Sequence, residues 1–185
     1  NIGLDKVGVK LKDNESGIKV DKKMQTNLPN IYAIGDVTGE ILLAHVASHQ
    51  GIVAVNNIMG HECEMDYNTV PSAIFTHPEI ATVGLDEQTA KEKSIEYEVG
   101  KFPFRANGKV LTTGENQGFA KLISEKETGR LLGASIIGVN ATDLLAEVTL
   151  AIENDLTVED IAETIHAHPT TAETIHEAAL DLQGG

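Results

Sequence analysis

The chain has 185 residues, 41% of them hydrophobic, which suits one well-packed domain with an appendage. Its formal net charge of −14 disfavours binding to nucleic acid, because phosphate backbones attract clustered Lys and Arg. No apolar run reaches the roughly 18–20 residues that cross a bilayer, so no membrane association is expected, and the single cysteine favours a reducing, cytoplasmic compartment over a disulfide framework.

Residues 1–59 are predicted to contain a short β segment, a turn, a strand and a helix. The β segment covers 17–21, the turn 27–30 and the apolar strand 31–34. An amphipathic helix is predicted over 42–59, with an apolar stripe of Leu43, Val46, Ala47, Val53 and Ala54. Two strands and one helix cannot enclose a core. The polar stretch 60–66 then predicts a linker.

Residues 67–185 are predicted to form an α+β domain, in which helices pack on an antiparallel sheet. The predicted strands cover 70–75, 81–85, 97–104, 118–124 and 131–138, with a surface helix over 86–93 and a turn at 127–130. Asn140 or Thr142 is predicted to cap a helix whose apolar face is Leu144, Leu145, Val148 and Ile152. A short helix is predicted to begin at 157–160, and a final one presents Ile175, Ala178, Ala179 and Leu182 on one face.

The start of that last helix is the most informative segment, with the sequence HAHPTTAETIHE over 166–177. Pro169 suits the first positions of a helix, and Thr170 with Glu173 matches a T-x-x-E capping box. The helix is therefore predicted to begin just after His168, which places Glu173 one turn in and within reach of the imidazole. A carboxylate there fixes the tautomer and stabilises the imidazolium, as an acid/base dyad requires. The alternative is that Glu173 only caps the helix and His168 is an ordinary half-buried side chain.

A second segment points to ligand binding, because the apolar strand 31–34 ends in Gly35-Asp36. A glycine there lets a ligand approach the backbone, and the aspartate can accept a hydrogen bond from a sugar-like hydroxyl. Taken singly, this is a common turn. Together with the His-Pro-Thr-x-x-Glu element it is far more specific.

These motifs resemble the pyridine nucleotide–disulfide oxidoreductases, and within that family the dihydrolipoamide dehydrogenase branch. The resemblance is carried by TNLPNIYAIGD at 26–36, LAH at 43–45, FTHPEIATVG at 75–84 and HAHPT at 166–170. The doublet His-x-His-Pro-Thr favours the lipoamide branch over glutathione-reductase-like relatives, which usually have an apolar residue at the position of His166. Ala172 stands where the family usually has Ser, a small departure that leaves the dyad intact.

The resemblance also makes absences informative. The family has a Gly-rich FAD-binding turn, a redox-active Cys-x4-Cys pair and an NAD domain, whereas this chain has no G-x-G-x-x-G and only Cys63. The resemblance therefore implies that this chain is the carboxyl-terminal portion of such an enzyme. Residues 1–59 would close the FAD-binding domain, residues 60–66 would form a linker and residues 67–185 would form the dimerisation domain. Alone, the chain is expected to be inactive and to lack FAD and NAD.

The resemblance assigns roles to individual residues. Asp36 would bind the ribityl chain of FAD, and the backbone of Leu42, Leu43, Ala44 and His45, at a helix start, would approach the flavin ring. In a homodimer, His168 would take a thiol proton from dihydrolipoamide, and Glu173 would orient the His168 imidazole. The resulting thiolate would attack the redox disulfide of the partner subunit. Electrons would pass to FAD and then NAD. The implied partners are lipoyl domains of 2-oxoacid dehydrogenase or glycine cleavage complexes.

Other histidines are interpreted differently. His45 and His49 stand four apart and could form zinc ligands with His61 and Cys63, but structural zinc sites normally have four ligands at recognisable spacing, so no metal site is predicted. His77-Pro78 is expected in a strand-end turn and His176 in solvent. Two alternative functions stay open: a non-catalytic dimerisation module, and a related reductase acting on another disulfide or metal substrate.

Overall fold

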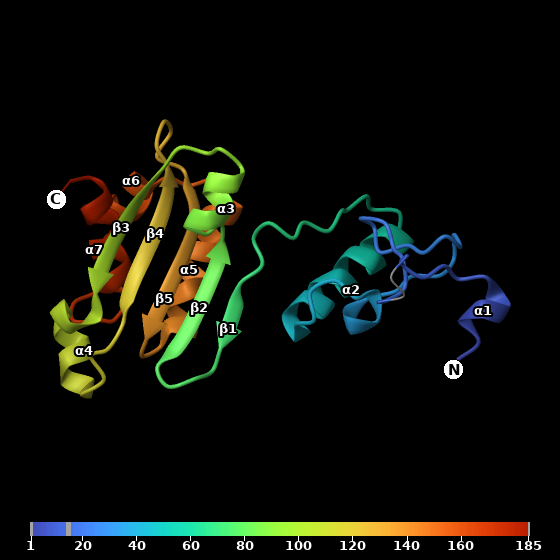
Figure 1. The fold of residues 1–185 in the computed structure, drawn as a ribbon, viewed down its shortest axis with the longest axis horizontal. Helices are drawn as coiled ribbons and strands as arrows, with labels where there is room; N and C mark the ends of the chain where they lie inside the picture. Colours follow the sequence, from blue (N-terminus) through green and yellow to red (C-terminus); the bar gives the residue numbers. More distant parts are fainter. Residues whose placement is uncertain (1, 14–15, 185) are drawn as a thin grey trace. The chain divides into compact units, whose positions relative to one another are not determined.

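The chain folds into two compact units, residues 1–67 and 68–185, each with its own hydrophobic core. The structure is a computed structural model that describes residues 2–13 and 16–184. Figure 1 shows the first unit in blue to cyan-green and the second in green to red. Among the residues described, no helix is long and apolar enough to cross a bilayer.

The first unit is built mainly from turns and short helices. It contains α1 (Leu4–Val7), the 3-10 helix η1 (Gly35–Thr38) and α2 (Ala44–Ile58). A small core forms around Val9, Ile18 and Ala33, so the expectation that this part of the chain cannot enclose a core is wrong, because Leu4 of α1 and the turn residue Leu28 also pack against it. The turn expected at 27–30 is confirmed by the hydrogen bond from the Ile31 N–H to the Leu28 carbonyl.

The strands expected over 17–21 and 31–34 are wrong, because each makes only an isolated bridge, Leu11 with Ile18 and Gln25 with Tyr32. A strand needs a continuous ladder with its neighbour. The segment opposite Tyr32 is curled instead: Met24 has a φ of 64°, and the Asp21 carboxylate accepts the N–H groups of Lys23 and Gln25.

Helix α2 begins at Ala44, two residues later than the predicted start. Its buried face contains Val46, Val53 and Ala54, as predicted, and also Gln50 at 1% exposure. The stretch 60–66 contains no helix or strand, yet it is tied to the first unit. The Met65 N–H donates to the Lys22 carbonyl, and the Asn57 amide donates to the Cys63 carbonyl.

The second unit is an antiparallel sheet with helices packed on it, which confirms the predicted fold class (Figure 1). Its strands follow the spatial order β1-β2-β5-β4-β3, and every neighbouring pair is antiparallel. The strands are β1 (Ser72–Ile74), β2 (Glu79–Gly84), β3 (Tyr97–Pro103), β4 (Phe119–Glu125) and β5 (Leu131–Gly138). The β1–β2 connection contains His77-Pro78, as expected.

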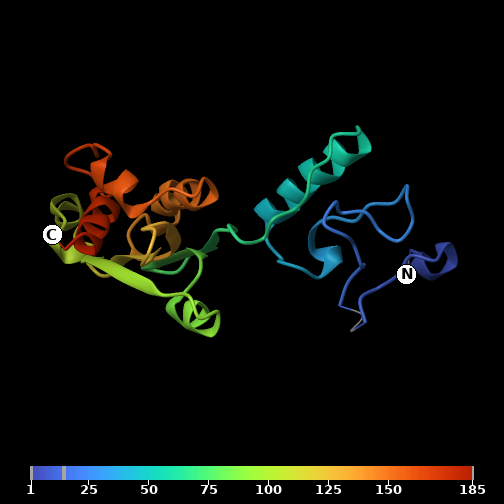
Figure 2. The ribbon, with the colours of Figure 1, turned by 90° about the horizontal axis from the view of Figure 1, so that it is seen from above.

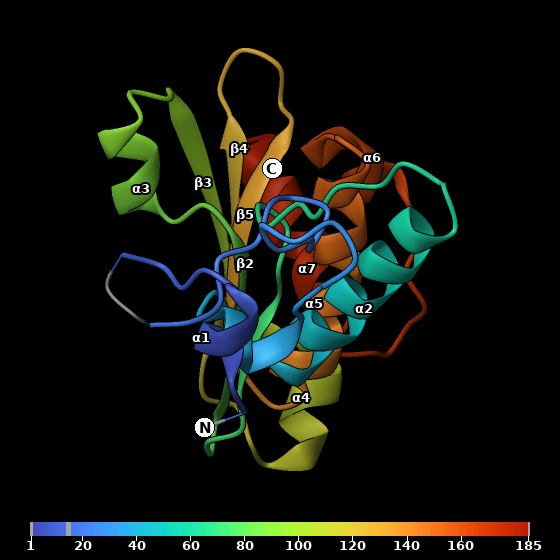
Figure 3. The same cartoon turned by 90° about the vertical axis from the view of Figure 1, so that its right-hand side faces the viewer.

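Helices cover the two faces of this sheet unequally. Helix α5 (Ala141–Glu153) packs on β2 and β5, and α7 (Glu173–Leu182) packs on β3 and β4, so both lie on one face (Figure 2). Helix α6 (Val158–Glu163) packs against α7. Because side chains alternate along a strand, Leu122 points into the helix-covered core while Lys121 faces the other way. There Lys121 pairs with Glu87 of α3 (Glu87–Glu92) at 2.7 Å, and Figure 3 shows α3 on that side.

Gly100 of β3 brings α7 unusually close to the sheet. A Cβ atom at this position would lie 2.1 Å from the carbonyl oxygen of Ala178, so no other residue fits without a shift of the helix. The Lys101 N–H also donates to the Asp181 carboxylate at 2.9 Å. The sheet therefore fixes the helix that begins with Glu173.

The helices expected over 86–93 and from 157–160 are confirmed as α3 and α6. Asp86 caps α3, and Thr157 with Asp160 forms a capping box on α6. The predicted cap of α5 is wrong: Asn140 has a φ of 58° and makes no side-chain cap. Instead the Glu79 carboxylate, from β2, accepts the N–H and hydroxyl of Thr142, because an anion is favoured at a helix start.

Two short helices that were not predicted follow β3. The 3-10 helix η2 (Phe104–Ala106) leads into α4 (Gly108–Thr113). Asn107 lies between them, 5% exposed, and its side-chain oxygen accepts the Val110 N–H at 2.9 Å. A short Asn-Gly segment gives too weak a sequence signal for a six-residue helix to be predicted.

Candidate functional site

His168 and Glu173 lie in contact at the start of α7, as the dyad hypothesis requires. His168 Nδ1 is 2.8 Å from Glu173 Oε1. The other oxygen, Oε2, accepts the Thr170 N–H at 2.8 Å. The imidazole is 78% exposed and the carboxylate 21%, so the ring faces solvent while its partner is held against the protein. The arrangement presents an oriented histidine to an incoming molecule.

The protonation of this pair follows from its hydrogen bonds. The Thr170 N–H and the His168 ring hold the pKa of Glu173 below its usual value, so this side chain is a carboxylate at neutral pH. A carboxylate only accepts, so Nδ1 donates and Nε2 is the basic atom of the neutral ring. Because the folded pKa is depressed, the stabilisation from Glu173 is present above its unfolded pKa and is lost as the pH falls through the lowered value.

The predicted helix start is wrong by about one turn. Helix α7 begins at Glu173 rather than just after His168, and Ala172 occupies the N-cap without a side-chain hydrogen bond. The Thr170 hydroxyl donates to the Ala167 carbonyl, so it does not cap the Glu173 N–H. Only half of the expected capping box forms. Glu173 thus binds a backbone N–H and the imidazole at once, one with each oxygen.

A second histidine–glutamate pair lies beside the first and was not predicted. His166 Nε2 is 2.8 Å from Glu147 Oε1 of α5, and its Nδ1 is 2.8 Å from the Thr164 carbonyl. The His166 side chain is only 7% exposed. His176, expected in solvent, instead packs its ring 5.0 Å from that of His166 and bonds the Ala162 carbonyl at 3.0 Å. The solvated interpretation of His176 is wrong because α6 covers that side of α7.

The Gly35-Asp36 turn lies in the first unit and exposes the Asp36 carboxylate. Gly35 has a φ of 74°, a conformation that favours glycine. Its N–H donates to the buried Gln50 Oε1 at 2.6 Å, and Gln50 in turn donates to the Tyr67 hydroxyl at 2.8 Å. Gln50 was missed as a site-supporting residue. Its signal was a polar side chain at an apolar position of the α2 stripe.

The predicted flavin-facing segment forms the entry to α2. Leu43 is the N-cap residue and makes no side-chain cap hydrogen bond. Leu42, Ala44 and His45 are exposed. A helix start of this kind presents backbone N–H groups and the positive end of the helix dipole.

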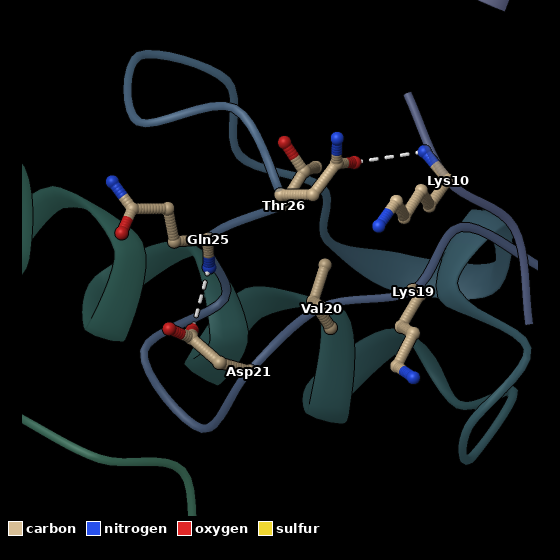
Figure 4. A pocket seen from close by; sticks show the side chains of 7 residues that line it. Lys10, Lys19, Val20, Asp21, Gln25 and Thr26 are labelled. Carbon is tan, nitrogen blue, oxygen red and sulfur yellow. Dashed lines mark hydrogen bonds between the residues drawn. The ribbon is translucent and has the colours of Figure 1, made fainter. Parts of the chain in front are cut away.

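Other candidate sites gain no support. The described residues contain no group of three or more His, Cys, Asp or Glu side chains placed to hold a metal ion. A hollow in the first unit, drawn in Figure 4, is lined by Lys10, Lys19, Val20, Asp21, Gln25, Thr26 and Asn27. None of the predicted site residues lines it.

Comparison with known proteins separates the same two parts of the chain. The family model described as "Pyridine nucleotide-disulphide oxidoreductase, dimerisation domain" matches residues 70–179, and "Pyridine nucleotide-disulphide oxidoreductase" matches residues 1–51. The chain belongs to the pyridine nucleotide-disulphide oxidoreductase family. The resemblance seen in the sequence is thereby confirmed.

Relatives of this oxidoreductase chain share close sequence similarity. It is 57% identical over 180 residues to the dihydrolipoyl dehydrogenase of Chlamydia muridarum, covering 97% of this chain and 38% of the relative. It is 48% identical to that of Bacillus subtilis, covering 96% and 38%, and 47% identical to the human mitochondrial one, covering 100% and 36%. The chain thus spans well under half the length of these relatives.

Two solved structures share the fold of this chain. LpdA from Mycobacterium tuberculosis superposes with a TM-score of 0.91 at 31% identity, over 97% of this chain and 39% of that one. A Cu(II) complex of the flavoprotein disulfide reductase RclA from Escherichia coli gives 0.89 at 23% identity, over 96% and 40%. The second likeness shows the fold alone.

Proposed function

We propose that this chain provides the acid/base pair and the dimer interface of a flavoprotein that oxidises protein-bound dihydrolipoamide with NAD. The observation that carries the proposal is the bond between His168 Nδ1 and Glu173 Oε1, which leaves Nε2 basic and exposed. The relatives named dihydrolipoyl dehydrogenase supply the substrate class. Lipoyl domains of 2-oxoacid dehydrogenase or glycine cleavage complexes are the proposed carriers of that substrate.

The proposed step is a proton transfer from sulfur to nitrogen. Dihydrolipoamide presents an S–H group, His168 Nε2 takes the proton, and the sulfur becomes a thiolate. Only the thiolate is an effective nucleophile toward a disulfide. The imidazolium that results faces the Glu173 carboxylate, whose negative charge stabilises it. Thr170 keeps that carboxylate in place through its N–H.

The first unit is proposed to close the FAD-binding domain, with the linker at 60–66 and the dimerisation domain from 67 onward. Its residues fit FAD: Asp36 offers an exposed carboxylate to a hydroxyl, and the entry to α2 at Leu42–His45 offers backbone N–H groups to an electron-rich carbonyl. FAD and NAD would supply the electron transfer. The Gln50 hydrogen bond holds the Gly35 backbone beside Asp36 and supports this fit.

The isolated 185-residue chain should show no lipoamide-dependent NAD reduction and weak or no FAD binding. The reason is that it has one cysteine and no G-x-G-x-x-G turn. Absorbance of the purified chain between 350 and 500 nm, with a standard NADH assay, tests this expectation. A yellow preparation that turns over would contradict it. Inactivity of the isolated chain is also expected if the chain is a non-catalytic dimerisation module. Replacing His168 with Gln in the complete reductase distinguishes the two functions.

Residues 67–185 should self-associate as a symmetric dimer, because the proposed chemistry needs a redox disulfide from a second subunit. Ile165 directly precedes His166 and is 97% exposed, so it offers apolar surface beside the site. Sedimentation at tens of micromolar, an order of magnitude suited to a standard-size interface, should give a dimer. Ile165→Asp should weaken it. A strict monomer at that concentration would count against the proposal.

A further inference from the structure

We propose that Glu147 and His166 form a positioning pair that aims His168, a role that rests on the proposed base function of His168. His168 itself has little to hold it, since its ring is 78% exposed and, within the part of the chain that the structure describes, hydrogen-bonds to Glu173 alone. Residues 164–172 contain no helix or strand. The direction of the His168 ring therefore depends on what fixes this segment to the body of the domain.

His166 is the anchor on the amino-terminal side of His168. Its ring is 7% exposed and both nitrogens are bonded at 2.8 Å, Nε2 to Glu147 and Nδ1 to the Thr164 carbonyl. The Glu147 carboxylate and the Thr164 carbonyl hold the ring from two sides and join the segment to α5. The ring of His176 packs against it at 5.0 Å.

Asn107 is the anchor on the other side. Its side-chain nitrogen donates to the Thr170 carbonyl at 3.1 Å, and its oxygen caps α4 through the Val110 N–H. Asn107 is 5% exposed, so this bond is shielded from water. The two anchors come from different elements and bracket His168, at residues 166 and 170. Displacing either end of so short a segment displaces the imidazole between them.

The test uses the complete reductase and matched pairs of substitutions. His166→Gln can place its amide nitrogen near the position of Nε2 and keep the bond to Glu147, whereas His166→Asn can reach only Thr164. Likewise Glu147→Gln keeps an acceptor and Glu147→Ala removes it. We expect His166→Asn and Glu147→Ala to lower kcat by about ten- to a hundredfold, the effect of misplacing a catalytic group by about 1 Å. The two Gln variants should recover most of the loss.

Further measurements separate positioning from folding. The double variant His166→Asn/Glu147→Ala should be no worse than either single variant, because both break one contact. Asn107→Asp keeps the cap on α4 but loses the donor to Thr170 and sets a carboxylate oxygen against that carbonyl, so kcat should fall, and thermal melts run in parallel measure the loss of stability that accompanies it. The imidazole NMR signal of His168, assigned by its absence in His168→Gln, should move in each impaired variant. Should Glu147→Ala fail to fold, the comparison of His166→Asn with His166→Gln decides alone.

Including His168→Gln distinguishes failure of the positioning role from failure of the proposed function. If His168→Gln is inactive while His166→Asn and Asn107→Asp turn over within twofold of the parent, the positioning role is overturned and the base assignment stands. If His168→Gln itself is active, the proposed function fails, and with it any role for an anchor. Equal losses in His166→Asn and His166→Gln would also overturn the role of the Glu147 contact.

Discussion

Replacing His168 with Gln in the complete reductase is expected to lower lipoamide turnover by about two to four orders of magnitude, the usual range for a positioned acid or base. The substitution removes the basic Nε2 that the Glu173 contact leaves exposed to an incoming thiol. Steady-state assays over a range of pH, with thermal melts in parallel, measure the effect. Because the His168 side chain is mostly exposed, the melting temperature should change little.

Glu173→Gln should cost less activity than His168→Gln, because the imidazole remains. Turnover should still fall, since the imidazolium formed in the reaction loses the carboxylate that stabilises it. If Glu173 served only to bind the Thr170 N–H, Gln would substitute with little loss, because its amide oxygen can also accept. Equal turnover and equal stability in Glu173→Gln and the parent would therefore favour a role for Glu173 in capping alone.

His166→Gln is the matched control for the dyad and should retain most activity. Its ring is enclosed and bonded at both nitrogens, so it cannot receive a proton from a thiol at the surface. A greater loss in His166→Gln than in His168→Gln, at unchanged stability, would mean that the base is assigned to the wrong histidine.

Phe104→Ala should give the largest loss of stability, about 3–5 kcal/mol by comparison with other buried phenylalanines. Phe104 is fully buried in the core of the second unit, and its ring fills the space that a Cβ atom on Gly138 would enter. Denaturant unfolding of the chain, followed by circular dichroism, would measure the change in the free energy of unfolding.

Phe75→Ala is the control with the same change of side chain. Phe75 is 81% exposed in the β1–β2 connection, where truncation usually changes stability by within about 0.5 kcal/mol. Similar losses in the two variants would contradict the burial argument. In the complete reductase, Phe104→Ala should also reduce turnover, because Phe104 begins the short helix that leads to Asn107.

Much of the second unit could be predicted because its signals are local. Alternation of side chains and turn residues located β3, β4 and β5 to within one residue. The His168–Glu173 contact spans five residues and was also within reach of sequence reasoning. The Glu147–His166 and Asn107–Thr170 contacts span 19 and 63 residues, and no periodicity or motif connects residues at such separations.

The first unit was harder to predict for the opposite reason. The apolar run 31–34 has the composition of a strand, but composition does not specify a neighbour, and the segment facing it turns away at Met24. Gln50 was likewise hidden, because helical spacing assigns its position to the core without showing that a backbone N–H at Gly35 needs an acceptor there. Local pattern predicts which residues are buried more readily than it predicts which polar groups are paired.

The close approach at Gly100 affects how inactivating variants should be interpreted. Gly100 lies in the middle of a strand, and the sequence around it gives no hint of catalysis. Any side chain there would press on Ala178 and push α7 away from the sheet, and Glu173 is the first residue of that helix. A substitution at residue 100 would then resemble the loss of a catalytic group in an activity screen, although it leaves every reacting atom in place.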